Sequence, residues 1–241
     1  MTSLAAIFAH PDDETYATGA TIARYANEGV RCSLYCATDG DAGRSSGISV
    51  SSREALGRLR RAELTAAAGI LGIATVECGG HPDGKLAQAD ADVVIGEIVS
   101  LIRRERPDVV LTFGPEGAPT QHGDHRVISQ LATAACLLAD TTAYAEQFVN
   151  GASPHRPRRL CYVTWPLPEP DAFYLTEGQP VDVALDARPW IDRKRRAFLS
   201  HASQQQHREN FERYALTDSE FYFVAIGAPA PPGATDLFAG L

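Results

Sequence analysis

Short apolar runs alternate with predicted helices along the first 140 residues of the chain. Four of the runs have the length of buried strands: residues 4–10, 30–38, 74–78 and 108–113. Four segments that follow them are predicted as helices: residues 14–27, 53–69, 91–104 and a segment that ends near residue 139. Four successive β–α units favour a parallel sheet with helices on both faces.

From residue 140 onwards this alternation loosens. Two further strands are predicted at residues 160–164 and 181–185, and a helix is predicted at residues 189–203. The expected fold class is α/β, with a Rossmann-like, doubly wound and mostly parallel sheet in the common strand order 3-2-1-4-5.

The length of the chain, 241 residues, suits one large α/β domain. No internal repeat or domain boundary is visible, so residues 1–241 are expected to form a single domain. We divide it into a Rossmann-like core at about residues 1–140 and a part at residues 141–241 that completes the sheet and a cleft.

Composition and charge exclude several classes of partner. The net charge of −8 argues against nucleic acid, and no apolar run approaches the ~20 residues needed for membrane insertion. The N-terminus lacks the basic region of a signal peptide, and five scattered cysteines are typical of reduced thiols. These features predict a cytoplasmic protein. A homo-oligomer is possible, since the sequence does not determine the oligomeric state.

The unusual polar motifs all follow predicted strands. After strands one to four stand, in that order, "HPDDE" (10–14), "TDGDAGR" (38–44), "GGHPDG" (79–84) and "QHGDHR" (121–126). Open α/β sheets build their sites beyond the carboxyl ends of strands. In the expected order strands one and four are neighbours, so the first and fourth motifs face each other. The groups brought together are His10, Asp12, Asp13, His122, Asp124 and His125.

Imidazole nitrogens and carboxylate oxygens are ligands that suit zinc, and a bound dication relieves the repulsion among adjacent carboxylates. A catalytic zinc needs three protein ligands and an open position for water. A carboxylate left beside that water is a natural general base, so one of Asp12 and Asp13 can bind metal while the other faces the water. His122 and His125 lie on one helix face because they are three residues apart.

These motifs resemble those of the LmbE-like, or PIG-L-type, zinc-dependent N-deacetylases. The similarity rests on "AHPDDE" and "HGDH", with weaker blocks in the expected order: "TDGDAG", "RRAELTAAAGILGI", "PDGKL", "TFGPEGAPTQHGDH" and "KRRAFLSHASQ". By position, the resemblance implies that His10, Asp13 and His125 bind one Zn²⁺ per chain. It implies that Asp12 is the general base.

The same resemblance implies that His122 stabilises the oxyanion or protonates the departing amine. Arg60 and Asp83 become candidates for holding sugar hydroxyls. Some members place a tyrosine just before the HxxH motif, but Thr120 and Gln121 stand here. The general acid is therefore left open.

The implied activity is removal of the acetyl group from a small-molecule, N-acetylated amino-sugar conjugate of the N-acetylglucosamine type. The alternatives are another metal-dependent amidase or hydrolase, or a 2-His-1-carboxylate iron enzyme, since Fe²⁺ or another divalent metal also suits these ligands. A nucleotide-binding GxGxxG turn is absent after the first strand. The aglycone is expected to contact the loops after strands two and three, and residues 140–180.

Four further residues have other expected roles. Asp124 is expected to accept N–H groups near the start of its helix, although it could bind metal. Glu14 is expected to support a ligand. His81 begins "HPDG", which is a strong turn signal, and it should lie away from the centre of the sheet. His201 is left open between core packing and a place in the site.

Overall fold

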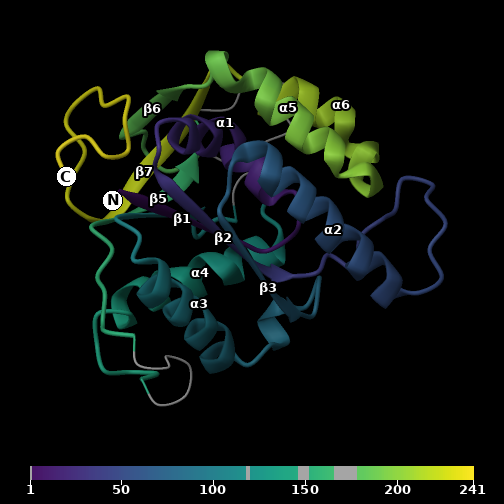
Figure 1. Ribbon diagram of the computed structural model, residues 1–241, viewed down its shortest axis with the longest axis horizontal. Helices are drawn as coiled ribbons and strands as arrows, with labels where there is room; N and C mark the ends of the chain where they lie inside the picture. The colour runs from purple at the N-terminus through teal and green to yellow at the C-terminus, as the bar shows by residue number, and fades with distance from the viewer. Residues whose placement is uncertain (1, 118–119, 146–151, 166–177) are drawn as a thin grey trace.

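Seven strands form one sheet in the computed structural model, with helices on both of its faces (Figure 1). The structure describes residues 2–117, 120–145, 152–165 and 178–241. Within these residues the strands follow the order β3-β2-β1-β4-β5-β7-β6.

The strands are β1 (Ser3–Phe8), β2 (Arg31–Thr38), β3 (Thr75–His81), β4 (Val109–Phe113), β5 (Arg159–Thr164), β6 (Val183–Asp186) and β7 (Ser219–Gly227). The α-helices are α1 (Asp13–Asn27), α2 (Arg53–Leu71), α3 (Ala91–Glu105), α4 (Gly123–Leu138), α5 (Ile191–Ser200) and the single turn α6 (Arg208–Asn210). Each element predicted from the sequence is present, with ends that differ by a few residues.

The predicted strand order is confirmed for β1 to β5 and is wrong for the sheet as a whole. β1 pairs in parallel with both β2 and β4, as the two-motif site requires. Beyond β5, however, β7 enters the sheet antiparallel to β5, and β6 pairs antiparallel with β7. No strand was predicted at β7, and its position between β5 and β6 depends on pairing between distant segments.

The helices form two layers. α1, α2 and α5 pack against one another on one side of the sheet, and α3 packs against α4 on the other (Figure 1). β1 lies between the layers, which is why all six of its residues are buried. No helix among the described residues has the length and apolar character needed to cross a membrane.

The predicted helix at 189–203 is shorter than expected. α5 ends at Ser200, and a 3₁₀ turn follows at Ala202–His207. His201 lies between them with φ −81° and ψ 66°, so the chain bends there, and the His201 side chain is fully buried. This bend gives His201 a contact with the first turn of α1.

Candidate metal and catalytic site

Two histidines meet where β1 and β4 end. His10 follows β1, and His125 lies in the first turn of α4, which follows β4. His10 Nδ1 lies 3.2 Å from His125 Nε2, and both residues are buried. The ring of His125 stacks on Phe113 at the end of β4, with 4.1 Å between the ring centroids. The predicted convergence of the first and fourth motifs is confirmed.

Asp13 completes this group of nitrogens and oxygens. Its Oδ1 lies 3.2 Å from His125 Nε2, and its Oδ2 lies 3.4 Å from His10 Nδ1. Two zinc ligands at about 2.0–2.1 Å with tetrahedral angles lie about 3.3–3.4 Å apart, so these separations suit a shared zinc ion. Asp13 Oδ2 also accepts the His10 backbone N–H at 2.8 Å, which fixes its orientation.

The other nitrogen of His10 faces two more carboxylates. His10 Nε2 lies 3.2 Å from Asp83 Oδ1 and 3.3 Å from Asp124 Oδ2. A proton on Nε2 satisfies these acceptors and leaves Nδ1 with its lone pair toward Asp13 and His125. Metal-binding histidines are commonly oriented by such a carboxylate.

Two groups of side chains among the described residues could hold a metal: His10 with His122 and His125, and His10 with Asp83 and Asp124. The first shares two residues with the predicted ligand set. In the second, Asp124 is already engaged, because it accepts the backbone N–H groups of Gly84 and Leu86 at 2.7 and 3.0 Å. The donor chemistry therefore favours a cation on the Nδ1 side of His10.

The charges of the buried groups around His10 also favour a bound cation. Burial lowers the pKa of His10, but hydrogen bonds with Asp124, Asp13 and Asp83 raise it well above its usual value. Burial raises the pKa of Asp13, but His125 and His10 hold it well below its usual range. Burial likewise raises the pKa of Asp83, but its hydrogen bond with His10 lowers it to about 2. Several buried carboxylates thus share few positive partners, and a dication compensates such an excess.

Asp12 has a strained backbone immediately before α1. Its φ of 115° lies where non-glycine residues rarely occur and costs on the order of 1–3 kcal/mol. Burial raises the pKa of Asp12 to about 6, and Arg60, 3.5 Å from Asp12 Oδ1, opposes this increase. A carboxyl that titrates near neutral pH suits a general base.

Arg60 mainly contacts the loops around Asp12. Its Nη1 donates to the Gly40 carbonyl at 2.8 Å and its Nη2 donates to the Pro11 carbonyl at 2.5 Å. These contacts differ from the sugar contact expected from the sequence. Nε of this side chain is buried and has no hydrogen-bond partner among the described residues, and the sugar contact of Arg60 stays a prediction.

His122 caps α4 at the exposed edge of the site. Its Nδ1 accepts the Asp124 backbone N–H at 3.2 Å, which assigns the ring proton to Nε2. The ring lies 4.8 Å from that of His10 and 5.1 Å from that of His125, measured between centroids. Burial, with His10 and His125 nearby, lowers the pKa of His122, so at neutral pH the ring presents a neutral N–H donor.

Three residues with uncertain sequence-based roles have defined contacts. Asp124 accepts N–H groups, as expected, although they come from the loop after β3 rather than from its own helix. Glu14 Oε2 accepts the Asp12 backbone N–H at 3.0 Å. His201 Nε2 lies 2.9 Å from Glu14 Oε1. Because His201 is fully buried, it supports Glu14 and does not line the site.

The second His-Pro-Asp segment, His81 to Asp83, has one contact that was not expected and one position that was. Asp83 was expected only to contact sugar hydroxyls, but it contacts His10 directly and also accepts the Ala42 N–H at 2.8 Å. His81 itself lies apart from the centre, with its Nε2 2.8 Å from Glu97 on α3. A turn follows at Asp83–Gly84, as predicted.

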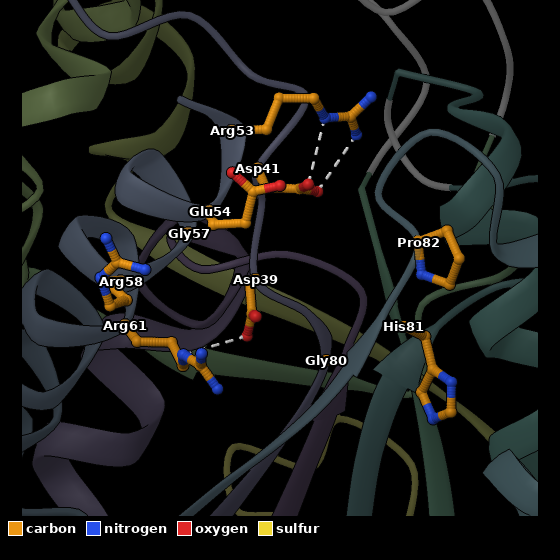
Figure 2. A pocket seen from close by; sticks show the side chains of 10 residues that line it. All are labelled: Asp39, Asp41, Arg53, Glu54, Gly57, Arg58, Arg61, Gly80, His81 and Pro82. Carbon is orange, nitrogen blue, oxygen red and sulfur yellow. Dashed lines mark hydrogen bonds and ion pairs between the residues drawn. The ribbon is translucent and has the colours of Figure 1, made fainter. Parts of the chain in front are cut away.

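A polar cavity of about 430 Å³ lies between α2 and the loops after β2 and β3, and none of the residues of the centre line it (Figure 2). Two ion pairs, Arg53 with Asp41 and Arg61 with Asp39, lie along the α2 side of the cavity. Its lining is Asp39, Asp41, Arg53, Glu54, Gly57, Arg58, Arg61, Gly80, His81 and Pro82. These are the two loops expected to contact the aglycone. Of the third expected segment, residues 146–151 and 166–177 lie outside the described residues.

Comparison with known sequences identifies similar proteins along nearly the whole chain. The model of the family PIG-L, described as GlcNAc-PI de-N-acetylase, matches residues 5–136. A 1D-myo-inositol 2-acetamido-2-deoxy-alpha-D-glucopyranoside deacetylase from Rhodococcus erythropolis is 31% identical, and the alignment covers 98% of this chain and 96% of that protein. Its counterpart from Rhodococcus opacus is also 31% identical, covering 98% and 97%.

Solved structures share the fold. The 4-carboxy-2-hydroxymuconate hydratase GalB from Pseudomonas putida has a TM-score of 0.78 at 22% identity, over 97% of this chain and 100% of that one. The N,N'-diacetylchitobiose deacetylase from Pyrococcus horikoshii has a TM-score of 0.75 at 22% identity, over 92% and 83%. Because a hydratase and a deacetylase both share this fold, the fold alone does not determine the reaction.

Proposed function

Because this chain belongs to the PIG-L family of GlcNAc-PI de-N-acetylases, we propose that it is a metal-dependent hydrolase. It removes the acetyl group from an N-acetylglucosamine conjugate. The observation that carries this proposal is the convergence of His10 Nδ1, His125 Nε2 and the Asp13 carboxylate within 3.2–3.4 Å of one another.

In this proposal His10, Asp13 and His125 hold one zinc ion. When bound, zinc acts as a Lewis acid and lowers the pKa of water at its open position to about 7. The buried donor set supports this choice of ligands, since two neutral imidazoles and one carboxylate suit zinc and leave a fourth position open. Asp83 and Asp124 hold the proton on His10 Nε2 and thereby present Nδ1 as a ligand.

Asp12 is the proposed general base. It accepts a proton from the attacking water as the water oxygen bonds to the acetamide carbon. His122 donates its Nε2–H to the former carbonyl oxygen, on which negative charge develops. The carbon–nitrogen bond then breaks, the nitrogen takes up a proton, and acetate and a free amine leave. His122 and protonated Asp12 are the two candidates for supplying that proton.

The proposed substrate is a polar N-acetylglucosaminide. The Rhodococcus relatives are named for a GlcNAc–inositol conjugate, and this supports testing that compound first. Arg60 contacts Asp12 and Asp83 contacts His10, and both residues are proposed to meet sugar hydroxyls. The charged cavity lined by Asp39, Asp41 and Pro82 suits a hydroxylated aglycone, since its carboxylates accept and its guanidinium groups donate hydrogen bonds.

Acetate release from a panel of N-acetylglucosaminides tests the proposal, with the protein as purified, after chelation, and after zinc is restored. The panel includes the GlcNAc–inositol conjugate, N,N'-diacetylchitobiose and free N-acetylglucosamine. We expect turnover to disappear on chelation and to return with zinc. Oxygen-dependent turnover without acetate would instead support the 2-His-1-carboxylate iron enzyme that the same ligands permit.

A further inference from the structure

The peptide unit between Pro11 and Asp12 is held at both ends by buried charged side chains. Arg60 Nη2 donates to the Pro11 carbonyl oxygen at 2.5 Å, and Glu14 Oε2 accepts the Asp12 N–H at 3.0 Å. Orientation of this peptide plane determines the φ of Asp12, which is 115°. Since φ sets the direction of the Asp12 side chain, the two contacts together hold its carboxylate in place.

Glu14 is itself held by a residue from the other end of the chain. Glu14 Oε1 accepts hydrogen bonds from His201 Nε2 at 2.9 Å and from the Thr15 hydroxyl at 2.5 Å. The side chains of Glu14 and His201 are 1% and 0% exposed, so water does not compete for this contact. His201 Nδ1 has no hydrogen-bond partner among the described residues. The contact with Glu14 therefore compensates for burying the imidazole.

We propose that His201 is a positioning residue, which acts through Glu14 to hold the Asp12 carboxylate in its reactive orientation. This inference rests on the proposed function, because it takes Asp12 as the general base. Without the His201 donor, Glu14 Oε1 keeps only the adjacent Thr15 hydroxyl of the donors that the structure describes. The charge of Glu14 is then less well compensated beside Asp12, and its side chain rotates away from the Asp12 N–H. The Asp12 N–H is then released, and the Asp12 backbone relaxes toward the negative φ that non-glycine residues prefer.

A purely structural role for His201 predicts a different result, and α5 offers a matched control. Lys194 on α5 forms a buried ion pair with Glu220 of β7, at 2.7 Å. Glu220 also accepts the backbone N–H groups of Ala20 and Thr21 in α1. Lys194→Met therefore weakens the packing of α5 on α1 without touching the peptide unit before Asp12.

The experiment compares His201→Phe, His201→Gln and Lys194→Met with the wild type, all loaded with zinc. His201→Phe should lower kcat about tenfold to a hundredfold at unchanged KM and unchanged zinc content, since small displacements of a reacting group have effects of this size. His201→Gln keeps an N–H donor and should recover kcat to within about threefold. Lys194→Met should lower the melting temperature while kcat stays within about twofold of the wild type.

The exchange rate of the Asp12 amide hydrogen, followed by NMR, is the readout that needs no activity. Exchange should be slow in the wild type and at least about tenfold faster in His201→Phe, because Glu14 no longer holds the amide. If His201→Phe does not fold, the smaller His201→Leu replaces it. Fast exchange of the Asp12 amide hydrogen in the wild type itself would overturn the proposal.

Two results contradict a positioning role. One is a His201→Phe protein that keeps wild-type kcat, and the other is an equal loss of kcat in Lys194→Met. Failure of the proposed function gives a different pattern, since no wild-type protein would then release acetate from any substrate. In that case the amide exchange still tests the contact of His201 with Asp12 through Glu14.

Discussion

The tripeptide His-Pro-Asp occurs twice, and its two copies have different surroundings. His10 follows β1, which lies inside the sheet between β2 and β4, whereas His81 ends β3, an edge strand. The two side chains are similarly buried, with 11% and 13% of each exposed. Burial therefore does not distinguish the two copies.

Their partners do distinguish them. His10 Nδ1 faces His125 and Asp13, while its Nε2 faces Asp83 and Asp124. His81 Nε2 has the single carboxylate of Glu97, which also accepts the Tyr35 hydroxyl at 2.5 Å. A histidine beside the central crevice meets loops from several strands, and the same motif at the edge meets one helix. Place in the strand order, rather than the motif, separates a candidate metal ligand from a structural residue.

The largest expected effect is that of His10→Ala, which removes the group at the centre of the first motif. A zinc site contributes about 10–16 kcal/mol over four ligands, so losing one should weaken metal binding by about 100-fold or more. Activity should fall with metal content. Metal analysis after dialysis, with acetate release on the same samples, measures both. Retention of stoichiometric zinc would remove His10 from the ligand set.

Asp12→Asn tests the aspartate of the same motif. The variant should keep its metal and lose about 10²–10⁴-fold in kcat, because asparagine cannot accept the proton from water. Zinc content and kcat at saturating substrate are the measurements. Asp186→Asn is the control, since Asp186 pairs with Arg188 at the end of β6. Wild-type turnover by Asp12→Asn would exclude it as general base.

Asp83→Asn tests the contact by which the second His-Pro-Asp copy supports His10 of the first. Loss of one carboxylate beside His10 Nε2 should weaken zinc binding about tenfold, near the lower end of such effects, because Asp124 remains. Turnover at saturating zinc should change less than in Asp12→Asn. Competition with a chelator of known affinity measures the change. An unchanged zinc affinity would mean that Asp83 does not orient His10.

The two aspartates should also respond to pH with opposite signs in the metal-free protein. The pKa of Asp12 is raised to about 6, so its folded form favours the proton, and stability falls as pH rises from about 4 to 6. The pKa of Asp83 is lowered to about 2, so its contribution is present above about pH 4 and is lost as pH falls toward 2. At pH 7, Asp12→Asn should therefore stabilise the metal-free protein and Asp83→Asn should destabilise it, each on the order of 2 kcal/mol.

Urea unfolding of both variants at pH 4 and pH 7 measures this difference. The stabilisation by Asp12→Asn should largely disappear at pH 4, where the wild-type carboxyl is already protonated. If both variants changed the free energy of unfolding in the same direction at pH 7, the predicted difference between Asp12 and Asp83 would be wrong. A stabilising change that removes activity is the pattern expected where function requires a strained, buried charge.

The part of the fold that local pattern encodes was predicted from the sequence. The four β–α units have distinct periodicities, and the adjacency of β1 and β4 follows from the common order of such sheets. β7 was missed because its place between β5 and β6 depends on antiparallel pairing with strands far away in the sequence.

The candidate site likewise has a part that the sequence predicted and a part that it did not. The meeting of His10, Asp13 and His125 followed from two motifs and one strand order. The contacts of Asp83 with His10 and of His201 with Glu14 depend on loop paths, and His201 lies 187 residues from Glu14. No spacing in the sequence encodes such a contact, so the roles of these two residues required the structure.

The smallest expected effect is that of His81→Ala, and it makes the comparison between the two motifs decisive. Zinc content should be unchanged and kcat at saturating substrate should stay within about twofold, because His81 contacts Glu97 and none of the groups around His10. Since His81 also lines the polar cavity, KM is the constant that the variant is free to change. Stability should fall by about 1–2 kcal/mol, since a hydrogen bond to a charged group is lost while Tyr35 still supports Glu97. Urea unfolding measures this loss beside the metal and activity assays of His10→Ala. A loss of zinc in His81→Ala would mean that the edge strand reaches the metal, and strand order would then no longer explain why the two copies of the motif differ.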